Sequence, residues 1–157
     1  MRLPRGVGVA PRTAEAIQSG RTVAEVSLAG LRVLVVDDDH DSRHVLTEHL
    51  EGSGARVLTA SSASEALDVL NREPVDVLLA DIAMPGEDGY SLIRKLRSLE
   101  VAAASVPAAA LTAFAREEDR QQAFRAGFQL HLAKPVDAGS LIAAVATLGR
   151  WNPSSIR

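Results

Sequence analysis

Four carboxylates and one lysine of this sequence stand where short apolar runs end. The run LRVLVV is followed by Asp37, Asp38 and Asp39, the run VDVLLA by Asp81, and a later run by Lys134. Carboxylates that are partly removed from water repel one another unless a cation neutralises them. Oxygen ligands with no cysteine and no histidine in the cluster favour Mg²⁺. The sequence therefore predicts a magnesium site with a lysine close to it.

Asp81 is the carboxylate that such a site would make reactive. A divalent cation and an ammonium group together neutralise the charge that accumulates when a phosphoryl group moves onto a carboxylate oxygen. Asp81 would then be a nucleophile that forms an acyl phosphate. Thr112, at the end of another apolar run, could donate its hydroxyl to a phosphoryl oxygen, and the MPG sequence at 84–86 predicts a turn back toward the metal.

The elements that must position these residues alternate regularly along the chain. Aliphatic runs predict strands at 31–36, 55–60, 75–80, 107–111 and 129–133, and helical patterns occur at 42–51, 64–71, 90–99, 116–126 and 138–148. Five such pairs in succession predict a doubly wound α/β fold, a parallel sheet with helices on both faces. In such sheets ligands bind beyond the carboxyl ends of the strands, so the candidate residues should share one rim.

Two kinds of residue are expected at the helix ends. Gly52 and Gly127 are predicted to be C-terminal caps, because glycine adopts the backbone conformation that ends a helix. Asp39 or Asp41 could cap the helix that follows the first strand instead of binding metal. This alternative suits Asp37 and Asp38 poorly, because they continue the strand.

Composition excludes several other classes of function. The chain has 157 residues, enough for one domain, which we expect at 31–150 between a tail or linker at 1–30 and a tail at 151–157. A formal net charge of −3 argues against nucleic-acid binding, and the lack of cysteine excludes disulfides and thiolate metal sites. No apolar stretch is long enough to cross a membrane. We expect a cytoplasmic protein that contacts neither nucleic acid nor membrane directly.

Four motifs resemble the receiver domain of two-component response regulators, the family that includes the chemotaxis regulator. They are VVDDD at 35–39, DIAMPGEDG at 81–89, LTA at 111–113 and AKP at 133–135. The resemblance implies a flavodoxin-like fold with five parallel strands in the order 2-1-3-4-5. It also implies that Asp38 ligates Mg²⁺ directly, that Asp37 does so mainly through water, and that the backbone carbonyl of Ala83 is a further ligand. Asp81 would be both a metal ligand and the phosphoryl acceptor.

The same resemblance assigns the remaining roles and the partners. Thr112 and Lys134 would bind phosphoryl oxygens, and the peptide bond between Lys134 and Pro135 would be cis. His131 occupies the position near the middle of the fifth strand where the family usually has an aromatic switch residue. The sequence around it looks most like receivers of hybrid sensor histidine kinases. The implied partners are a histidine kinase or histidine phosphotransfer domain, and a downstream protein that binds the face of the fourth helix, fifth strand and fifth helix.

Three other functions are alternatives to a phosphorylated receiver. A flavodoxin-like cofactor binder needs an anion loop rich in glycine and hydroxyl groups after the first strand, where DDDHD would repel a phosphate. An enzyme that turns over phosphate esters usually needs a cap insertion, and these loops are short. A receiver-like docking module without phosphorylation would not need the intact acidic cluster. His44 and His49 are weak candidates for a phosphodonor, because a lone helical histidine is common. We therefore expect a receiver that assists its own phosphorylation and not a turnover enzyme.

Overall fold

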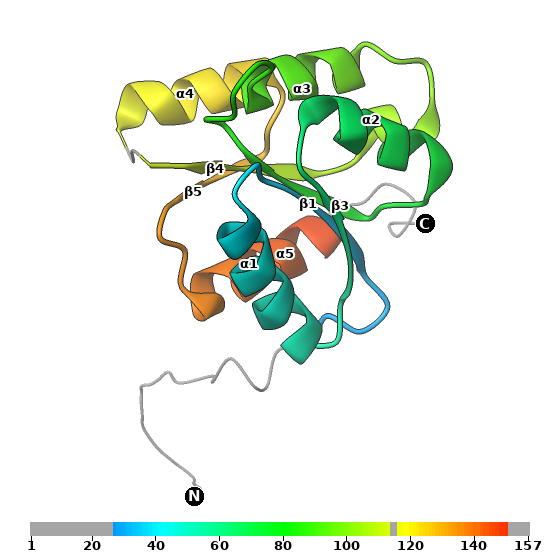
Figure 1. Ribbon diagram of the computed structural model, residues 1–157, viewed down its shortest axis with the longest axis vertical. Helices are drawn as coiled ribbons and strands as arrows, with labels where there is room; N and C mark the ends of the chain where they lie inside the picture. Colours follow the sequence, from blue (N-terminus) through cyan, green and yellow to red (C-terminus); the bar gives the residue numbers. More distant parts are fainter. Residues whose placement is uncertain (1–26, 114–115, 151–157) are drawn as a thin grey trace, which may run out of the picture.

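A parallel five-stranded sheet forms the middle layer of the protein (Figure 1). The computed structural model describes residues 27–113 and 116–150. The strand order β2-β1-β3-β4-β5, with every neighbouring pair parallel, confirms the predicted doubly wound α/β fold. The strands are β1 (Arg32–Val36), β2 (Arg56–Ala60), β3 (Val77–Asp81), β4 (Ala108–Thr112) and β5 (Leu130–Ala133).

Helices cover both faces of the sheet: α1 and α5 lie on one side, and α2, α3 and α4 lie on the other (Figure 1). Each predicted helix is present, and a short 3₁₀ helix, which was not predicted, precedes β4. The bounds are α1 (His40–Gly52), α2 (Ala63–Arg72), α3 (Gly89–Arg97), η2 (Ala102–Ser105), α4 (Glu117–Ala126) and α5 (Ala138–Arg150).

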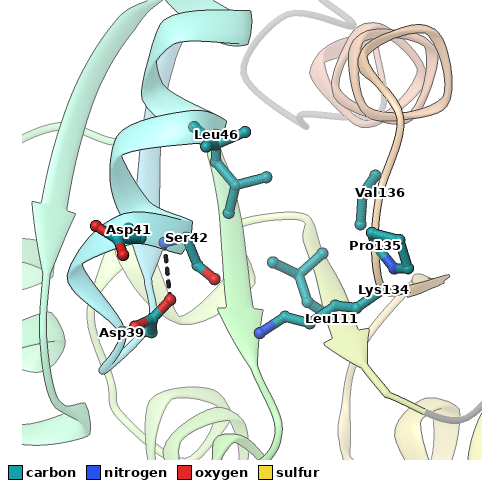
Figure 2. A pocket seen from close by; sticks show the side chains of 9 residues that line it. Asp39, Asp41, Ser42, Leu46, Leu111, Lys134, Pro135 and Val136 are labelled. Carbon is teal, nitrogen blue, oxygen red and sulfur yellow. Dashed lines mark hydrogen bonds between the residues drawn. The ribbon is translucent and has the colours of Figure 1, made fainter.

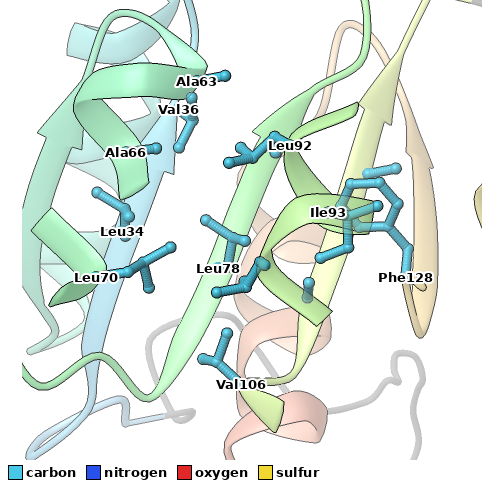
Figure 3. Packing of buried hydrophobic residues seen from close by; sticks show 14 of the residues in the cluster. Leu34, Val36, Ala63, Ala66, Leu70, Leu78, Leu92, Ile93, Val106 and Phe128 are labelled. Carbon is cyan, nitrogen blue, oxygen red and sulfur yellow. The ribbon is translucent and has the colours of Figure 1, made fainter. Parts of the chain in front are cut away.

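Alternate residues of each buried strand contribute to two hydrophobic clusters, one on each face. Leu34 and Leu78 pack under α2 and α3 in the cluster of Figure 3, whereas Val35 and Leu79 pack against α1 and α5. β1 is buried along nearly its whole length and β3 along all of it, which explains why their sequences are continuous apolar runs instead of alternating ones. Apolar packing on both faces therefore fixes the positions of β1 and β3, the strands that lead to Asp37 and Asp81.

Polar side chains begin four of the helices; that of α5 is Asp137, whose carboxylate accepts the backbone N–H of Ser140 at 2.9 Å. Asp39, Ser62 and Asp88 are the N-caps of α1, α2 and α3, and each side chain accepts a hydrogen bond from the backbone N–H three residues later. The capping role is therefore confirmed for Asp39, whereas Asp41 lies in the first turn of α1. Two of these caps adjoin the rim, so they fix where α1 and α3 start relative to the strand ends.

One of the two predicted glycine caps was wrong. Gly127 is the C-cap of α4 with φ of 130°, as expected. Gly52 is instead the last residue of α1, Ser53 is its C-cap, and Gly54 takes the positive φ of 101°. The helix continues one residue beyond the predicted end, and the reversal of the chain falls on the second glycine of the GSG sequence.

Leu28 is a core residue although the sequence placed it in the predicted tail. Its side chain is fully buried in the cluster under α1 and α5, and its backbone N–H donates to the carbonyl of Ser53 at 2.7 Å. Packing therefore starts before the predicted boundary at residue 31. The rest of the predicted tails, 1–26 and 151–157, lies outside the described residues. None of the helices in the described part of the chain has the length and apolar character needed to cross a membrane.

Candidate functional site

The carboxyl ends of four strands bring the predicted site residues together. Asp37 directly follows β1, Asp81 ends β3, Thr112 ends β4 and Lys134 directly follows β5. Pairing in register aligns these ends, because neighbouring strands stop at nearly the same level along the sheet. The backbone N–H of Lys134 donates to the carbonyl of Thr112 at 2.7 Å, which extends the β4–β5 pairing to the lysine itself. Residues almost one hundred positions apart thus share one rim.

Lys134 joins the two buried aspartates of the rim. Its Nζ lies 3.1 Å from Oδ2 of Asp37 and 3.1 Å from Oδ2 of Asp81. Asp37 is fully buried and Asp81 is 5% exposed. The other oxygen of each carboxylate accepts a backbone N–H, from Asp39 at 2.9 Å and from Ala83 at 3.1 Å. In each of the two carboxylates, one oxygen therefore binds the ammonium of Lys134 and the other binds a backbone N–H of the loop that follows.

The turn after β5 matches the expected geometry. The peptide bond between Lys134 and Pro135 is cis, as the resemblance implied. A cis bond at this position is readily formed only because the second residue is proline.

The negative charges of the aspartates at this rim exceed the positive charge of Lys134. Burial raises the pKa of Asp81, and the neighbouring charge of Asp37 adds to that increase, while Lys134 opposes it. Burial alone would lower the pKa of Lys134, but its hydrogen bonds and attraction to Asp37 and Asp81 raise it. Lys134 is therefore held in its charged form. Asp81 shares the ammonium of Lys134 with a second carboxylate, Asp37. Its pKa is therefore raised, because one lysine does not offset both burial and the charge of Asp37.

A third carboxylate makes the imbalance larger and suits a hard cation. Asp37, Asp38 and Asp81 each offer an oxygen within 4.8 Å of the others. Asp38 is exposed while the other two are buried, so the cluster opens to solvent on one side. Carboxylate oxygens with room for water on the open side fit Mg²⁺, which retains several waters when bound. Ala83 lies in the adjacent loop and is tied to Asp81 through its N–H.

His131 and His44 are not part of this cluster. His131 pairs with Ala110 of β4, and its Nε2 is buried without a hydrogen-bond partner among the described residues. It lies on the face of the sheet opposite to Leu130 and Leu132, which pack in the cluster of α1 and α5. His44 lies on the exposed surface of α1, with its Nε2 3.2 Å from Glu48. The structure thus places His131 under α4 and His44 on the outside of the molecule.

Two residues that sequence analysis left without a role support the site. A Cβ added at Gly89 would lie 2.6 Å from the backbone oxygen of Asp81, so only glycine lets α3 start this close to β3. Arg43 donates from Nη1 to the carbonyl oxygen of Asp37 at 2.7 Å. The glycine was visible within the motif at 81–89, but its reason is a tertiary contact. The arginine carried no signal beyond its place in the helix after the aspartates.

A cavity of about 430 Å³ opens beside Lys134, between α1 and the segment that follows β5 (Figure 2). Its inner wall is mostly apolar, and polar groups lie at its opening. The lining residues are Asp39, Asp41, Ser42, Val45, Leu46, Leu111, Lys134, Pro135 and Val136. Val45 is 46% exposed, which is unusual for a large aliphatic side chain in this protein. An apolar surface is therefore accessible immediately next to the charged cluster.

Comparison with known proteins identifies the family. The model of the response regulator receiver domain matches residues 33–146. The chain belongs to the response regulator receiver domain family. Among curated proteins, this receiver is 50% identical over 119 residues to an uncharacterized 14.6 kDa protein of Leptolyngbya boryana, covering 76% of this chain and 90% of that protein.

Other relatives of the receiver are much longer proteins. It is 34% identical over 111 residues to the sensor histidine kinase RcsC of Salmonella typhi, which is 71% of this chain but 11% of the kinase. It is 37% identical over 122 residues to the virulence transcriptional regulatory protein PhoP of Salmonella typhimurium, which is 78% of this chain and 53% of that regulator. The similarity therefore covers one part of each of these relatives.

Solved structures agree with the fold. A receiver domain of a Francisella response regulator has a TM-score of 0.72 at 30% identity, covering 78% of this chain and 98% of that one. The chemotaxis protein CheY4 of Vibrio cholerae also has a TM-score of 0.72, at 26% identity, covering 76% and 99%. The protein is a two-component signalling receiver by family and by fold.

Proposed function

We propose that this receiver accepts a phosphoryl group from a phosphohistidine donor onto Asp81, with Mg²⁺, as a step in a two-component phosphorelay. The observation that carries the proposal is the position of Lys134, whose ammonium bridges Asp81 and Asp37 in a cluster with more carboxylates than cations. A site that only stabilised the fold would not need this excess of negative charge. A site that receives a phosphoryl group through a metal does need it.

The residues of the rim would have different roles in the phosphoryl transfer. Asp37, Asp38, Asp81 and the backbone carbonyl of Ala83 would hold the metal. When bound, Mg²⁺ supplies positive charge to the transferring phosphoryl oxygens. A carboxylate oxygen of Asp81 forms the new bond to phosphorus while the bond from phosphorus to the donor nitrogen breaks, and the imidazole leaves with the electron pair.

Two further side chains stabilise the product. The ammonium of Lys134 is charged before the reaction, so it neutralises a phosphoryl oxygen without needing a proton from elsewhere. Thr112, at the end of the adjacent strand, would donate its hydroxyl to another phosphoryl oxygen. The receiver thereby assists its own phosphorylation and keeps the phosphoryl group on Asp81, whereas a turnover enzyme would pass it on and start again.

The proposed partners are those that the family resemblance implies, and the open side of the rim supports them. A histidine kinase or a histidine phosphotransfer domain would present its phosphohistidine from the exposed side marked by Asp38 and rest on the apolar cavity beside Lys134. The output would be a change in the face formed by α4, β5 and α5. His131 is the proposed switch residue, because it lies under α4 one strand away from Thr112. The signalling unit comprises about 31–150 together with Leu28, with tails on both sides and a cytoplasmic location.

A direct test uses a small phosphodonor. With Mg²⁺ and acetyl phosphate, the protein should gain one base-labile phosphoryl group, which borohydride trapping and mass spectrometry should locate at Asp81. Asp81→Asn should abolish labelling. Asp41→Asn, an exposed carboxylate near the rim, should label like the unaltered protein. Labelling that persists in Asp81→Asn would refute the proposal.

A further inference from the structure

Arg43 lies in α1 and reaches back to the loop that carries the candidate metal ligands. Its Nη1 donates to the carbonyl oxygen of Asp37 at 2.7 Å, in a partly buried position. Its backbone N–H makes the ordinary helical bond to Asp39 at 3.0 Å, so both ends of the residue attach to the same short loop. The proposed phosphoryl transfer uses none of these contacts.

The carbonyl that Arg43 binds belongs to the peptide unit between Asp37 and Asp38. On the other side of this residue, the N–H of Asp37 donates to the carbonyl of Ala60 in β2 at 3.1 Å. The Asp37 side chain is fixed in addition by the N–H of Asp39 and by Lys134. Asp38 is exposed, so the direction in which its carboxylate points depends on the peptide unit that carries it. Among the described residues, Arg43 is the side chain that hydrogen-bonds to this peptide unit.

Two acids near Arg43 lie outside the proposed ligand set. Hydrogen bonds from Ser61 are the main reason for the lowered pKa of Glu65, and the positive charge of Arg43 adds to this effect. Hydrogen bonds from Ser42 likewise lead in lowering the pKa of Asp39, with a smaller contribution from Arg43. Two acids outside the proposed ligand set therefore lie within range of the guanidinium.

We propose that Arg43 is a positioning residue for the magnesium site: by holding the carbonyl of Asp37, it directs Asp38 toward the cation without touching the cation. This inference rests on the proposed function. A purely structural role, in which Arg43 only joins α1 to the end of β1, makes a different prediction. Loss of a structural contact would lower the stability of the fold without changing the affinity for Mg²⁺.

The test compares Mg²⁺ affinity, measured by amide chemical shifts during a titration with MgCl₂, across matched variants. Arg43→Met should bind Mg²⁺ about tenfold more weakly than the unaltered protein, the size of effect found when a group that orients a metal ligand is lost. Arg43→Lys should recover at least half of this loss on a logarithmic scale, because an ammonium can donate to the same carbonyl. Arg72→Met is the control, since Arg72 is exposed and, within the described part of the chain, bonds inside its own helix to the carbonyl of Asp68 at 3.3 Å.

The outcomes separate this inference from the proposed function. If the unaltered protein binds Mg²⁺ and Arg43→Met binds within twofold of it, the positioning role is wrong and the proposed function stands. If the unaltered protein binds no Mg²⁺, both are wrong. Should Arg43→Met fail to fold, Arg43→Gln takes its place with the same thresholds. Weaker binding in Arg72→Met to the same extent would also overturn the inference.

Discussion

The sheet has a partly buried cation near each of its two ends, and the two cations have very different surroundings. Arg97, the last residue of α3, lies beside the amino ends of β4 and β5. Its guanidinium makes five hydrogen bonds of 2.5 to 3.1 Å, all to neutral oxygens. The acceptors are the carbonyls of Ala104, Val106 and Gly127 and the side chain of Gln129.

Lys134, at the carboxyl end, has two aspartates within 3.1 Å and a third carboxylate in the same cluster. Burial lowers the pKa of Arg97, but neutral oxygens of the protein accept the hydrogen bonds that its guanidinium donates. At Lys134 the fold supplies too little positive charge. The difference indicates that a buried cation surrounded by neutral acceptors serves the structure, whereas a cation outnumbered by acids marks a place where a further ligand belongs.

Arg97→Met should produce the largest change in stability. Loss of the guanidinium leaves several buried carbonyls without donors, and we expect the free energy of unfolding to fall by about 3 kcal/mol. Arg94→Met is the matched control on the same helix, where the arginine is exposed over the ring of Tyr90. It should change stability by no more than about 0.5 kcal/mol. Urea denaturation measures both, and equal effects would remove the structural half of the comparison.

Lys134→Met should make stability depend more strongly on Mg²⁺ than it does in the unaltered protein. Without metal, the two buried aspartates lose their shared cation, and we expect a loss of about 2 kcal/mol, reduced from the cost of breaking a fully buried pair because the rim is open to water. Mg²⁺ should bind more tightly to this variant, by about tenfold, because one repelling charge is gone. Thermal unfolding with and without MgCl₂ checks this. A variant that binds Mg²⁺ more weakly would contradict the assigned cluster.

Asp38→Asn should affect stability and metal binding in opposite directions. Removing the exposed carboxylate relieves repulsion, so the metal-free protein should become more stable by about 0.5 kcal/mol. Its affinity for Mg²⁺ should fall at least about tenfold, because a ligand charge is lost. Asp41→Asn, in the first turn of α1, should leave metal affinity unchanged. Unaltered Mg²⁺ affinity in the Asp38 variant would exclude it as a ligand.

The smallest effect is expected at His131. Burial lowers its pKa, while Asp119 of α4 opposes the decrease and Arg120 of α4 adds to it. Because the folded protein holds the neutral form, stability should decrease as the pH falls from above about 6.5 toward the lowered pKa, and recover as the pH rises. His131→Phe should lack this component, so the difference between the two unfolding curves at pH 7.5 and 5.5 isolates it. Parallel pH dependence in both proteins would mean that His131 does not contribute.

Local patterns were enough to predict the strands and α-helices and to place their ends within two residues. Continuous apolar runs indicated the buried strands, and His131 lies on the opposite face of β5 from Leu130 and Leu132, as the alternation of side chains along a strand requires. The motifs at the strand ends named the residues that meet at the rim, because parallel strands must bring their carboxyl ends to one edge. What each of these residues does there stays a prediction, and chemical tests must decide it.

Other features depended on contacts between distant parts of the chain. Arg97 finds its acceptor at Gly127, 30 positions away, and Leu28 finds its place only beneath α1 and α5. The requirement for glycine at position 89 comes from the backbone of Asp81 lying against it. Residue type and spacing thus determined which groups lie at the strand ends. Only the packed structure decided which charges are balanced, because burial and the supply of partners are properties of the whole fold and not of any segment.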